Sequence, residues 1–473
     1  MTKNKEISLL AIITLIFFLP LLMVSSDYQD DIYRSASGDS SFWFENARPV
    51  SVYILKIINQ NTITPDIFPL TLVLSIIILC GVSYSISNRL FHNDFRLRVA
   101  SFCILISNPF FLQNLSYKYD CITMAVCLAL SYMFVFKSDI GRFIYSFLYK
   151  IAIVFLLLCI YQPALSYIAG LMALYMSISI RSLELRKWLL WLLISSASVL
   201  ISFVLYKHFI SDHMLNQHYK IAGSILSLDK SLPGSLLKNY IGYFRECWGF
   251  LSKPLVSIAV TLTLISLILP FLKGSRVDLF KNIICIMMLA ICLTSVNIVL
   301  KEPKFQPREM IGFSLSFIYL ISLASKSKLG KYSSLSLAFA FIFTSFSISC
   351  YLSNMRNLID LRDSLIVNDI TTSMYKYNQE NVKIISFMND ALDILPAQTA
   401  ILKSNPLIYK LLGGVNFKED WYSQAVVNQK YNIQKQVKHI DQLPEGLAWD
   451  VNCYTRTALA GGVMYVEVGI YCK

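Results

Sequence analysis

The chain has 473 residues, of which 55% are hydrophobic and only 15% are charged, and its formal net charge is +13. Soluble proteins carry about a quarter charged residues, so this composition excludes an ordinary soluble domain. Most basic residues lie in short loops between apolar blocks, and no basic stretch is interleaved with aromatic residues. We therefore expect a lipid bilayer, and no nucleic acid, among the partners of this chain.

Blocks of about twenty apolar residues recur along the chain, and each is long enough to cross roughly 30 Å of hydrocarbon. Lys3 and Lys5 before the first block also resemble the start of a signal peptide, but Pro20 and the lack of a clear small-x-small cleavage site favour an uncleaved helix. The blocks predict about eleven transmembrane helices. These lie near residues 7–26, 67–87, 97–113, 121–137, 143–160, 164–180, 188–206, 254–272, 282–300, 311–325 and 332–351.

The orientation depends on the fifth and sixth helices. Lys150 lies near the middle of the fifth, so 151–180 could instead form one helix, which would reverse every later loop. Two helices joined at Tyr161-Gln162-Pro163 place the basic loops on one side, which the positive-inside rule marks as cytoplasmic together with the N-terminus. Pro163 also suits the first turn of a helix. The basic residues on that side are Lys3, Lys5, Arg89, Arg96, Arg98, Lys137, Arg142, Arg181, Arg186, Lys187, Lys273, Arg276, Lys281, Lys326, Lys328 and Lys331.

The opposite side receives a polar tail, which we predict to be a separate domain. Residues 352–395 have a mainly helical pattern, and 461–468 alternate like a strand. We therefore expect a membrane domain, 1–351, followed by a small α/β domain, 352–473. Cys453 and Cys472 lie apart from the cysteines of the apolar blocks and could form a disulfide there. The outer loops of the membrane domain would be 27–66, 114–120, 207–253 and 301–310.

The first outer loop holds the densest polar cluster, Ser26 to Arg34, followed by Gly38, Trp43 and Arg48-Pro49. Loops commonly carry sites, so we favour a functional role for the group as a whole. The adjacent carboxylates of Asp30 and Asp31 repel each other, which suits one of them to act as a general base. The pair could equally hold a divalent cation, magnesium or manganese, although no other spacing indicates a metal site.

Two other outer loops combine charges with aromatic residues. Tyr117, Lys118 and Asp120 lie in the turn 114–120, where an interfacial aromatic anchor with a surface ion pair explains them as well as a functional site does. Arg308 lies in the loop 301–310, where it could pair with a glutamate or bind a lipid phosphate; we favour the phosphate. Gln162 could be a buried polar contact between helices or a pocket ligand.

The residues of these loops resemble the serotype-converting O-antigen glucosyltransferases of enteric bacteria and their phages. The first pattern is Asp30-Asp31-x-Tyr33-Arg34, Gly38, Trp43 and Arg48-Pro49, and Tyr161-Gln162 adds a weaker one. The other long pattern is Asn108-Pro109-Phe110-Phe111-Leu112-x-Asn114-Leu115-Ser116-Tyr117-Lys118-Tyr119-Asp120. Many members of that family have glycine before the Arg-Pro pair, where this chain has Ala47.

The resemblance implies a GT-C architecture: an all-α polytopic membrane protein of the bacterial inner membrane with a periplasmic C-terminal domain. It implies an undecaprenyl-phosphate glucose donor and an O-antigen glycan acceptor. It also implies two partner proteins, a bactoprenol glucosyltransferase and a small flippase. In such an inverting transferase, Asp30 or Asp31 would be the catalytic base. Substrate would be bound by Arg34, Trp43, Arg48, Tyr117, Lys118, Asp120, Gln162 and Arg308.

Two other classes of function remain open at this point. A flippase or transporter of lipid-linked sugar would need charges or broken helices near mid-membrane and would often have an internal repeat. The sequence shows mainly charges at the outer mouth and no repeat. A non-enzymatic polysaccharide assembly or binding protein would use the tail as its binding module.

Overall fold

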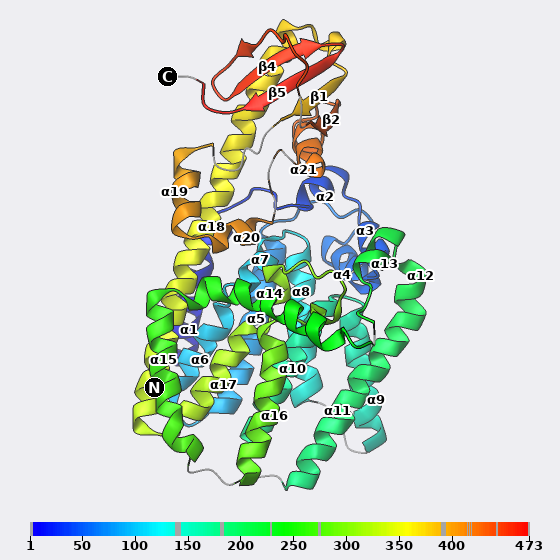
Figure 1. Ribbon diagram of the computed structural model, residues 1–473. Helices are drawn as coiled ribbons and strands as arrows, with labels where there is room; N and C mark the ends of the chain where they lie inside the picture. Colours follow the sequence, from blue (N-terminus) through cyan, green and yellow to red (C-terminus); the bar gives the residue numbers. More distant parts are fainter. Residues whose placement is uncertain are drawn as a thin grey trace. The chain divides into compact units, whose positions relative to one another are not determined.

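The computed structural model describes residues 3–137, 143–179, 184–227, 229–272, 276–388, 394–413, 415, 417, 419–440 and 443–471 (Figure 1). Its residues cluster into two compact units. The first unit comprises Met1–Leu19 and Asp39–Ser349, and the second comprises Pro20–Gly38 and Cys350–Lys473. The acidic segment of the first outer loop therefore belongs to the second unit, with the C-terminal residues.

The first unit is helical. Its helices pack mainly as neighbours such as α5 with α8, α9 with α11 and α10 with α16. They are α1 (Lys3–Leu22, shared with the second unit), α3 (Phe42–Glu45), α4 (Pro49–Asn59), α5 (Leu70–Phe91), α6 (Phe95–Ile106), α7 (Phe111–Ser116), α8 (Asp120–Phe136), α9 (Phe143–Leu158), α10 (Leu165–Ile178), α11 (Leu185–Tyr206), α12 (Asp212–Met214), α13 (Gln217–Ala222), α14 (Leu232–Leu251), α15 (Pro254–Leu272), α16 (Arg276–Leu293), α17 (Phe313–Ala324) and the start of α18 (Lys328–Lys376).

Each of the eleven predicted spans overlaps one of these helices. By length and composition, four helices of the described ranges can cross a membrane, namely Asn4–Leu22, Leu70–Phe91, Leu185–Met214 and Lys328–Lys376. Leu232–Leu251 and Pro254–Leu267 are bent by 106° and add a fifth if they form one broken span. The structure thus supports a membrane protein with several apolar helices, and the count of eleven crossings stays a prediction.

The predicted division between the fifth and sixth helices is confirmed. Helix α9 ends at Leu158, and α10 begins at Leu165 after a short 3-10 turn that starts at Gln162. Lys150 on α9 is buried, and its ammonium donates to the Ser195 hydroxyl at 2.8 Å. That hydrogen bond and the nearby ring of Trp191, 4.7 Å from the ammonium, accommodate the charge in an apolar helix.

The predicted helix 97–113 is wrong as one continuous element. Helix α6 ends at Ile106, and α7 begins only at Phe111. Pro109 disfavours helical backbone at Asn108 because its ring crowds the preceding residue. The Asn108 side chain accepts from the Phe110 amide at 3.1 Å and donates to the Ile311 carbonyl at 2.9 Å, so it stabilises the break.

The second unit contains a mixed five-stranded sheet with strand order β2-β1-β5-β4-β3 (Figure 1). The central strand β5 pairs in parallel with β1 and antiparallel with β4. This confirms the predicted α/β character of the tail. The strands are β1 (Ile384–Phe387), β2 (Gln436–His439), β3 (Asp450–Val451), β4 (Thr455–Ala460) and β5 (Val463–Val468); the helices are α2 (Asp31–Ser37), the end of α18, α19 (Pro396–Ser404), α20 (Leu407–Leu412) and α21 (Asp420–Gln424).

The last turns of α18 pack on the sheet through polar contacts. Tyr377 donates to the Thr457 carbonyl at 3.0 Å, and the Asp369 carboxylate accepts from the Tyr454 amide at 2.7 Å. Gly461 and Gly462, with φ of 57° and 81°, form the two-residue turn between β4 and β5. Glycine suits that turn because both positions need left-handed backbone.

Some predictions concern residues outside the described ranges. Arg142, Arg181 and Lys273, in three of the basic loops, are among them, and so is Cys472. Cys453 is disulfide-bonded. The predicted pairing of Cys453 with Cys472 stays a prediction.

Ala47 has left-handed backbone, with φ of 55°, and its side chain is fully buried. Left-handed backbone costs a residue with a Cβ roughly 1–2 kcal/mol, so this position favours glycine. The conformation is held from outside, because the Ala47 carbonyl accepts from the Tyr206 hydroxyl at 3.1 Å.

We expect Ala47→Gly to leave the free energy of unfolding within about 1 kcal/mol of wild type, since relief of strain offsets the loss of a buried methyl group. Ala47→Val should lower it by about 1–3 kcal/mol through added strain and overpacking. Thermal melting in detergent measures both changes. Equal losses for the two variants would show that backbone strain at Ala47 is unimportant.

A buried ionic network joins α18 to α21 in the second unit. The Arg362 guanidinium donates to Asp363 at 2.7 Å, to the Tyr422 hydroxyl at 3.1 Å and to the Val415 carbonyl at 3.2 Å. The Tyr422 hydroxyl in turn donates to Asp363 at 2.7 Å. Burial, followed by the Asp363 charge, raises the pKa of Tyr422 well above its ordinary value, so Tyr422 stays a hydrogen-bond donor.

We expect Arg362→Met to destabilise the second unit by about 3–5 kcal/mol, because it leaves the Asp363 carboxylate buried without its guanidinium. Hydrogen exchange of the β1 and β5 amides in urea reports that change. Adding Asp363→Leu should recover part of the loss, since no buried charge then remains. The matched control is Lys376→Met, which removes an exposed lysine side chain paired with Asp450 and should change stability little, because water screens an exposed ion pair. A loss in Arg362→Met no larger than in the control would contradict this account.

Candidate functional site

The two predicted catalytic carboxylates differ sharply in their surroundings. Asp31 begins α2 and is fully buried, whereas the Asp30 side chain just before the helix is 56% exposed. The positive end of the helix favours carboxylates at both positions. Arg34, one turn later, lies 3.6 Å from an oxygen of each carboxylate. The helix ends at Gly38, whose left-handed backbone lets its amide donate to the Arg34 carbonyl at 2.8 Å.

The residues just before this pair are fixed to the C-terminal part of the same unit. Tyr28 donates to the Leu411 carbonyl, and the Gln29 amide donates to the Leu412 carbonyl at 3.1 Å. Gln29 has a φ of 50°, which is strained backbone for a residue with a side chain. Strain of this kind clusters at functional sites and persists only where the surroundings impose it. Tyr33, within α2, donates to the Trp421 carbonyl at 2.9 Å.

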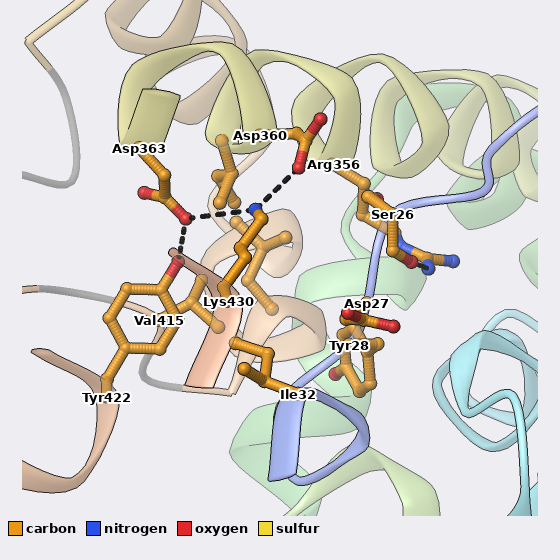
Figure 2. Close-up of a pocket in the computed structure, with 12 residues that line it drawn as sticks. Ser26, Asp27, Tyr28, Ile32, Arg356, Asp360, Asp363, Val415, Tyr422 and Lys430 are labelled. Carbon is orange, nitrogen blue, oxygen red and sulfur yellow. Dashed lines mark hydrogen bonds and ion pairs between the residues drawn. The ribbon is translucent and has the colours of Figure 1, made fainter. Parts of the chain in front are cut away.

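Arg356, on α18, contacts this segment (Figure 2), and the sequence analysis did not identify it. Its guanidinium is buried, donates to the Ser26 carbonyl at 2.5 Å and lies 5.5 Å from the centre of the Tyr28 ring. The negative charges of Asp31 and Asp27 also act on it. The signal in the sequence is the spacing of Arg356, Asp360 and Asp363, which places three charges on one face of a helix.

In the first unit, Arg308 lies in a network that includes several uncharged polar groups. Its guanidinium donates to the Tyr117 hydroxyl and lies 5.5 Å from the centre of that ring. Its carbonyl accepts from the Tyr161 hydroxyl at 2.7 Å and from the Asn114 amide at 3.1 Å. Its own amide donates to Gln113 at 2.7 Å. The loop 301–310 is therefore fixed to both predicted motifs, 108–120 and 161–162.

The Arg48 guanidinium packs against the ring of Tyr161. Its guanidinium carbon is 5.1 Å from the centre of the Tyr161 ring, and its Nε is buried with no hydrogen-bond partner among the described residues. The preceding residue is held by a chain of hydrogen bonds, since Gln162 donates to Tyr206 at 2.7 Å and Tyr206 donates to the Ala47 carbonyl. Arg308 adjoins Tyr161 through its carbonyl, and the charges of both arginines act on Tyr161. An anion is the ligand that two such cations favour.

Glu309 adds a carboxyl group beside this cluster. It accepts a hydrogen bond from Tyr243. Burial raises the pKa of Glu309, although Tyr243, Asn297 and the charge of Arg308 act in the opposite direction.

Trp43, Lys118 and Asp120 are buried and paired. The Trp43 indole donates to Asp120 at 2.5 Å and packs in a core cluster with Val52. Lys118 forms an ion pair with Asp66 at 2.7 Å. These contacts anchor the first outer loop to the start of α8. They suit Trp43, Lys118 and Asp120 to a structural role that supports the site.

The donor set does not suit a metal ion. In the described part of the chain, no three histidine, cysteine, aspartate or glutamate residues gather as metal ligands would. Two carboxylates next to Arg34 also favour an ion pair over a divalent cation. We therefore assign no step of the chemistry to magnesium or manganese.

The structure groups the predicted site residues into two sets. Asp30, Asp31 and Arg34 lie together in the second unit. The remaining predictions lie in the first unit, where Tyr117 contacts Arg308, Trp43 contacts Asp120, and Gln162 supports the residue before Arg48.

Comparisons with known proteins agree with these motifs. A Salmonella phage P22 protein described as "Uncharacterized 55.3 kDa protein in gtrB 5'region" is 32% identical over 245 residues, which cover 50% of this chain and 49% of that protein. The chain thus spans about half the length of the curated relative that it matches. No solved structure matches. The family model for glucosyl transferase GtrII matches residues 19–321, most of the chain and all of the predicted site residues, so the chain belongs to the GtrII glucosyl transferase family.

Proposed function

We propose that this chain transfers a glucosyl group from undecaprenyl-phosphate glucose to a sugar hydroxyl of O-antigen at the periplasmic face of the inner membrane. The family supports glucosyl transfer. The observation that carries the choice of donor is the pair of arginines beside Tyr161: the Arg48 guanidinium packs on its ring, the Arg308 carbonyl accepts from its hydroxyl, and both positive charges act on it. A phosphate anion on a lipid tail is the ligand that this chemistry suits.

The reaction is a single displacement. The acceptor hydroxyl oxygen forms a bond to the anomeric carbon, and the bond from that carbon to the phosphate oxygen breaks. The phosphate leaves with the electron pair, and the configuration at the anomeric carbon inverts. The hydroxyl proton passes to a carboxylate, for which we propose Asp30, because its side chain is the exposed member of the acidic pair.

The other residues take supporting roles in this proposal. Asp31, buried beside Arg34, orients the start of α2, and Arg34 holds both carboxylates in place. Arg48 and Arg308 stabilise the charge that grows on the leaving phosphate. Tyr117 orients the guanidinium of Arg308 through its hydrogen bond.

The membrane context follows from the same proposal. The eleven predicted spans with a cytoplasmic N-terminus place the outer loops and the tail in the periplasm. An apolar groove between α15 and α18, lined by residues such as Leu262 and Phe339, suits the prenyl chain of the donor. A bactoprenol glucosyltransferase would make the donor in the cytoplasm, and a small flippase would carry it across.

The direct experiment supplies radiolabelled undecaprenyl-phosphate glucose and O-antigen to the purified protein in liposomes. Label in the glycan supports the transferase. Movement of the donor across the bilayer without transfer would support a flippase, and binding alone would support an assembly protein. Either of those results would overturn the proposal.

We expect Asp30→Asn to lower the transfer rate by about 10²–10⁴-fold without lowering the melting temperature, because it removes the base and little burial. Asp31→Asn should instead lower the melting temperature, since it removes a buried charge that faces Arg34. The same liposome assay and thermal melting in detergent separate the two effects. Wild-type transfer by both single variants and by the double variant would defeat the assignment of the base.

We expect Arg48→Gln to lower kcat by about 10²-fold, because one electrostatic contact to the leaving phosphate is lost. Arg48→Lys should recover only part of this loss, since an ammonium lacks the planar fork of a guanidinium. Arg308→Gln should behave like Arg48→Gln. The matched control is Arg96→Gln, an exposed arginine of the predicted cytoplasmic face. Equal activity of Arg48→Gln and the control would remove Arg48 from the mechanism.

A further inference from the structure

Helix α14 runs across the direction of α15, the helix that follows it. The two helices are bent by 106° at a short break, and Figure 1 shows α14 lying transversely to α15 and α16. Pro254 begins α15 and disfavours helical backbone at Lys253, so the break follows from the sequence. Because α15 contains the predicted span 254–272, α14 runs along the outer surface of the bilayer when α15 crosses it.

One side of α14 is an exposed apolar stripe. It consists of Leu237, Ile241, Phe244 and Trp248, whose helical spacing places them on one side of the helix. Their exposed fractions range from 37% for Phe244 to 60% for Leu237. Contiguous apolar residues that remain exposed mark a surface that contacts a membrane or another molecule.

The residues around the stripe favour a lipid bilayer as its partner. Lys238 and Arg245 are exposed and flank the stripe, where their cations suit phospholipid phosphates. Trp248 suits the boundary between the headgroups and the acyl chains. The apolar surface continues past the bend, where Ile258 and Ile265 of α15 are also exposed. This continuity with a predicted span favours lipid over a protein partner.

The opposite side of α14 is buried and fixes the start of the loop 301–310. The side-chain amide of Asn239, a buried residue, donates to the carbonyls of Ile298 and Leu300, each at 2.8 Å. These carbonyls lie directly before the loop. The position of α14 therefore determines where the loop begins.

The next turn of α14 holds the end of the same loop. The Tyr243 hydroxyl donates to Glu309, and the ring centres of Tyr243 and Phe305 lie 5.0 Å apart. Gly242 lies so close to the Phe305 ring that a Cβ at this position would collide with it. Arg308 directly precedes Glu309. The depth of α14 in the membrane therefore sets the depth of Arg308.

We infer that α14 is an interfacial helix whose apolar stripe inserts into the outer leaflet and holds the loop 301–310 at the level of the lipid phosphates. Lys238 and Arg245 contact the headgroups, and the stripe lies among the upper acyl chains. This position is stable because it removes the apolar stripe from water. The membrane contact is independent of the proposed function, whereas the placement of Arg308 beside the donor phosphate rests on it.

Spin labels measure the depth of α14 directly. Ile241→Cys labels the stripe, and Lys238→Cys is the matched control on the charged side of the same helix. In liposomes of phosphatidylethanolamine and phosphatidylglycerol, the label at position 241 should collide more with oxygen, which dissolves in lipid, than with a water-soluble nickel chelate. The label at position 238 should show the opposite preference. Labelled wild type supplies the background from the native cysteines.

Two results of this experiment would overturn the inference. A label at position 241 that prefers the nickel chelate would show that the stripe faces water. A label at that position shielded from both reagents would show that a protein partner or a second copy of the chain covers the stripe.

The role of α14 in donor binding is tested by combining Ile241→Gln with Phe244→Gln, which makes the stripe polar. The KM for undecaprenyl-phosphate glucose should rise about tenfold, because Arg308 no longer lies at the depth of the phosphate. The KM for O-antigen should stay within about twofold of wild type. Combining Ile241→Leu with Phe244→Leu keeps the stripe apolar and should retain the wild-type donor KM. Thermal melting in detergent checks that both double variants fold.

The matched control is Val451→Gln, which changes an exposed apolar residue of the second unit. Equal donor KM values in the glutamine and leucine double variants would overturn the placement of Arg308 by α14. So would an equal rise in the control, since that would indicate a general effect of exposed apolar residues. Absence of transfer by wild type would overturn the proposed function and the placement role with it, and the spin labels would still decide the membrane contact.

Discussion

The contact between Arg356 and the Ser26 carbonyl is the interaction on which the acidic segment depends. A guanidinium removed from water is costly unless its donors and its charge find partners. Here the partners are a backbone carbonyl, the face of Tyr28 and the charges of Asp31 and Asp27. The segment that bears the proposed base is thereby tied to a helix more than three hundred residues later in the chain, which explains why Pro20–Gly38 clusters with the C-terminal unit.

The contacts between the acidic segment and the C-terminal residues also explain the strained backbone of that segment. Gln29 adopts a left-handed conformation, and its side chain donates to two carbonyls, those of Leu412 and Gly413. A non-glycine residue keeps such backbone only where external contacts outweigh a cost of roughly 1–2 kcal/mol. Ala47 has comparable backbone and is held by Tyr206. In both places a strained backbone conformation lies immediately before a predicted functional residue, Asp30 in one case and Arg48 in the other.

Sequence reasoning found what depends on local pattern. Apolar block lengths located the helices, the proline after Gln162 located the break before α10, and two glycines and alternating residues located the last strand. It failed where long-range contacts decide. Nothing local to Ser26 indicates Arg356, and nothing local to Lys430 indicates Asp360 (Figure 2), because partners so distant in sequence meet only through the fold. Local pattern also could not divide the roles of Asp30 and Asp31, since only burial distinguishes two adjacent carboxylates.

The surroundings of the two proposed cations and of the proposed base fit the role proposed for each. A leaving phosphate needs cations, and Arg48 and Arg308 contact tyrosine, glutamine and backbone groups through the bonds described above. An accepting base needs a carboxylate whose neighbours do not bury it, and Asp30 is 56% exposed beside Arg34. The tyrosine contacts orient the cations without cancelling their charge, which is the property that phosphate stabilisation requires.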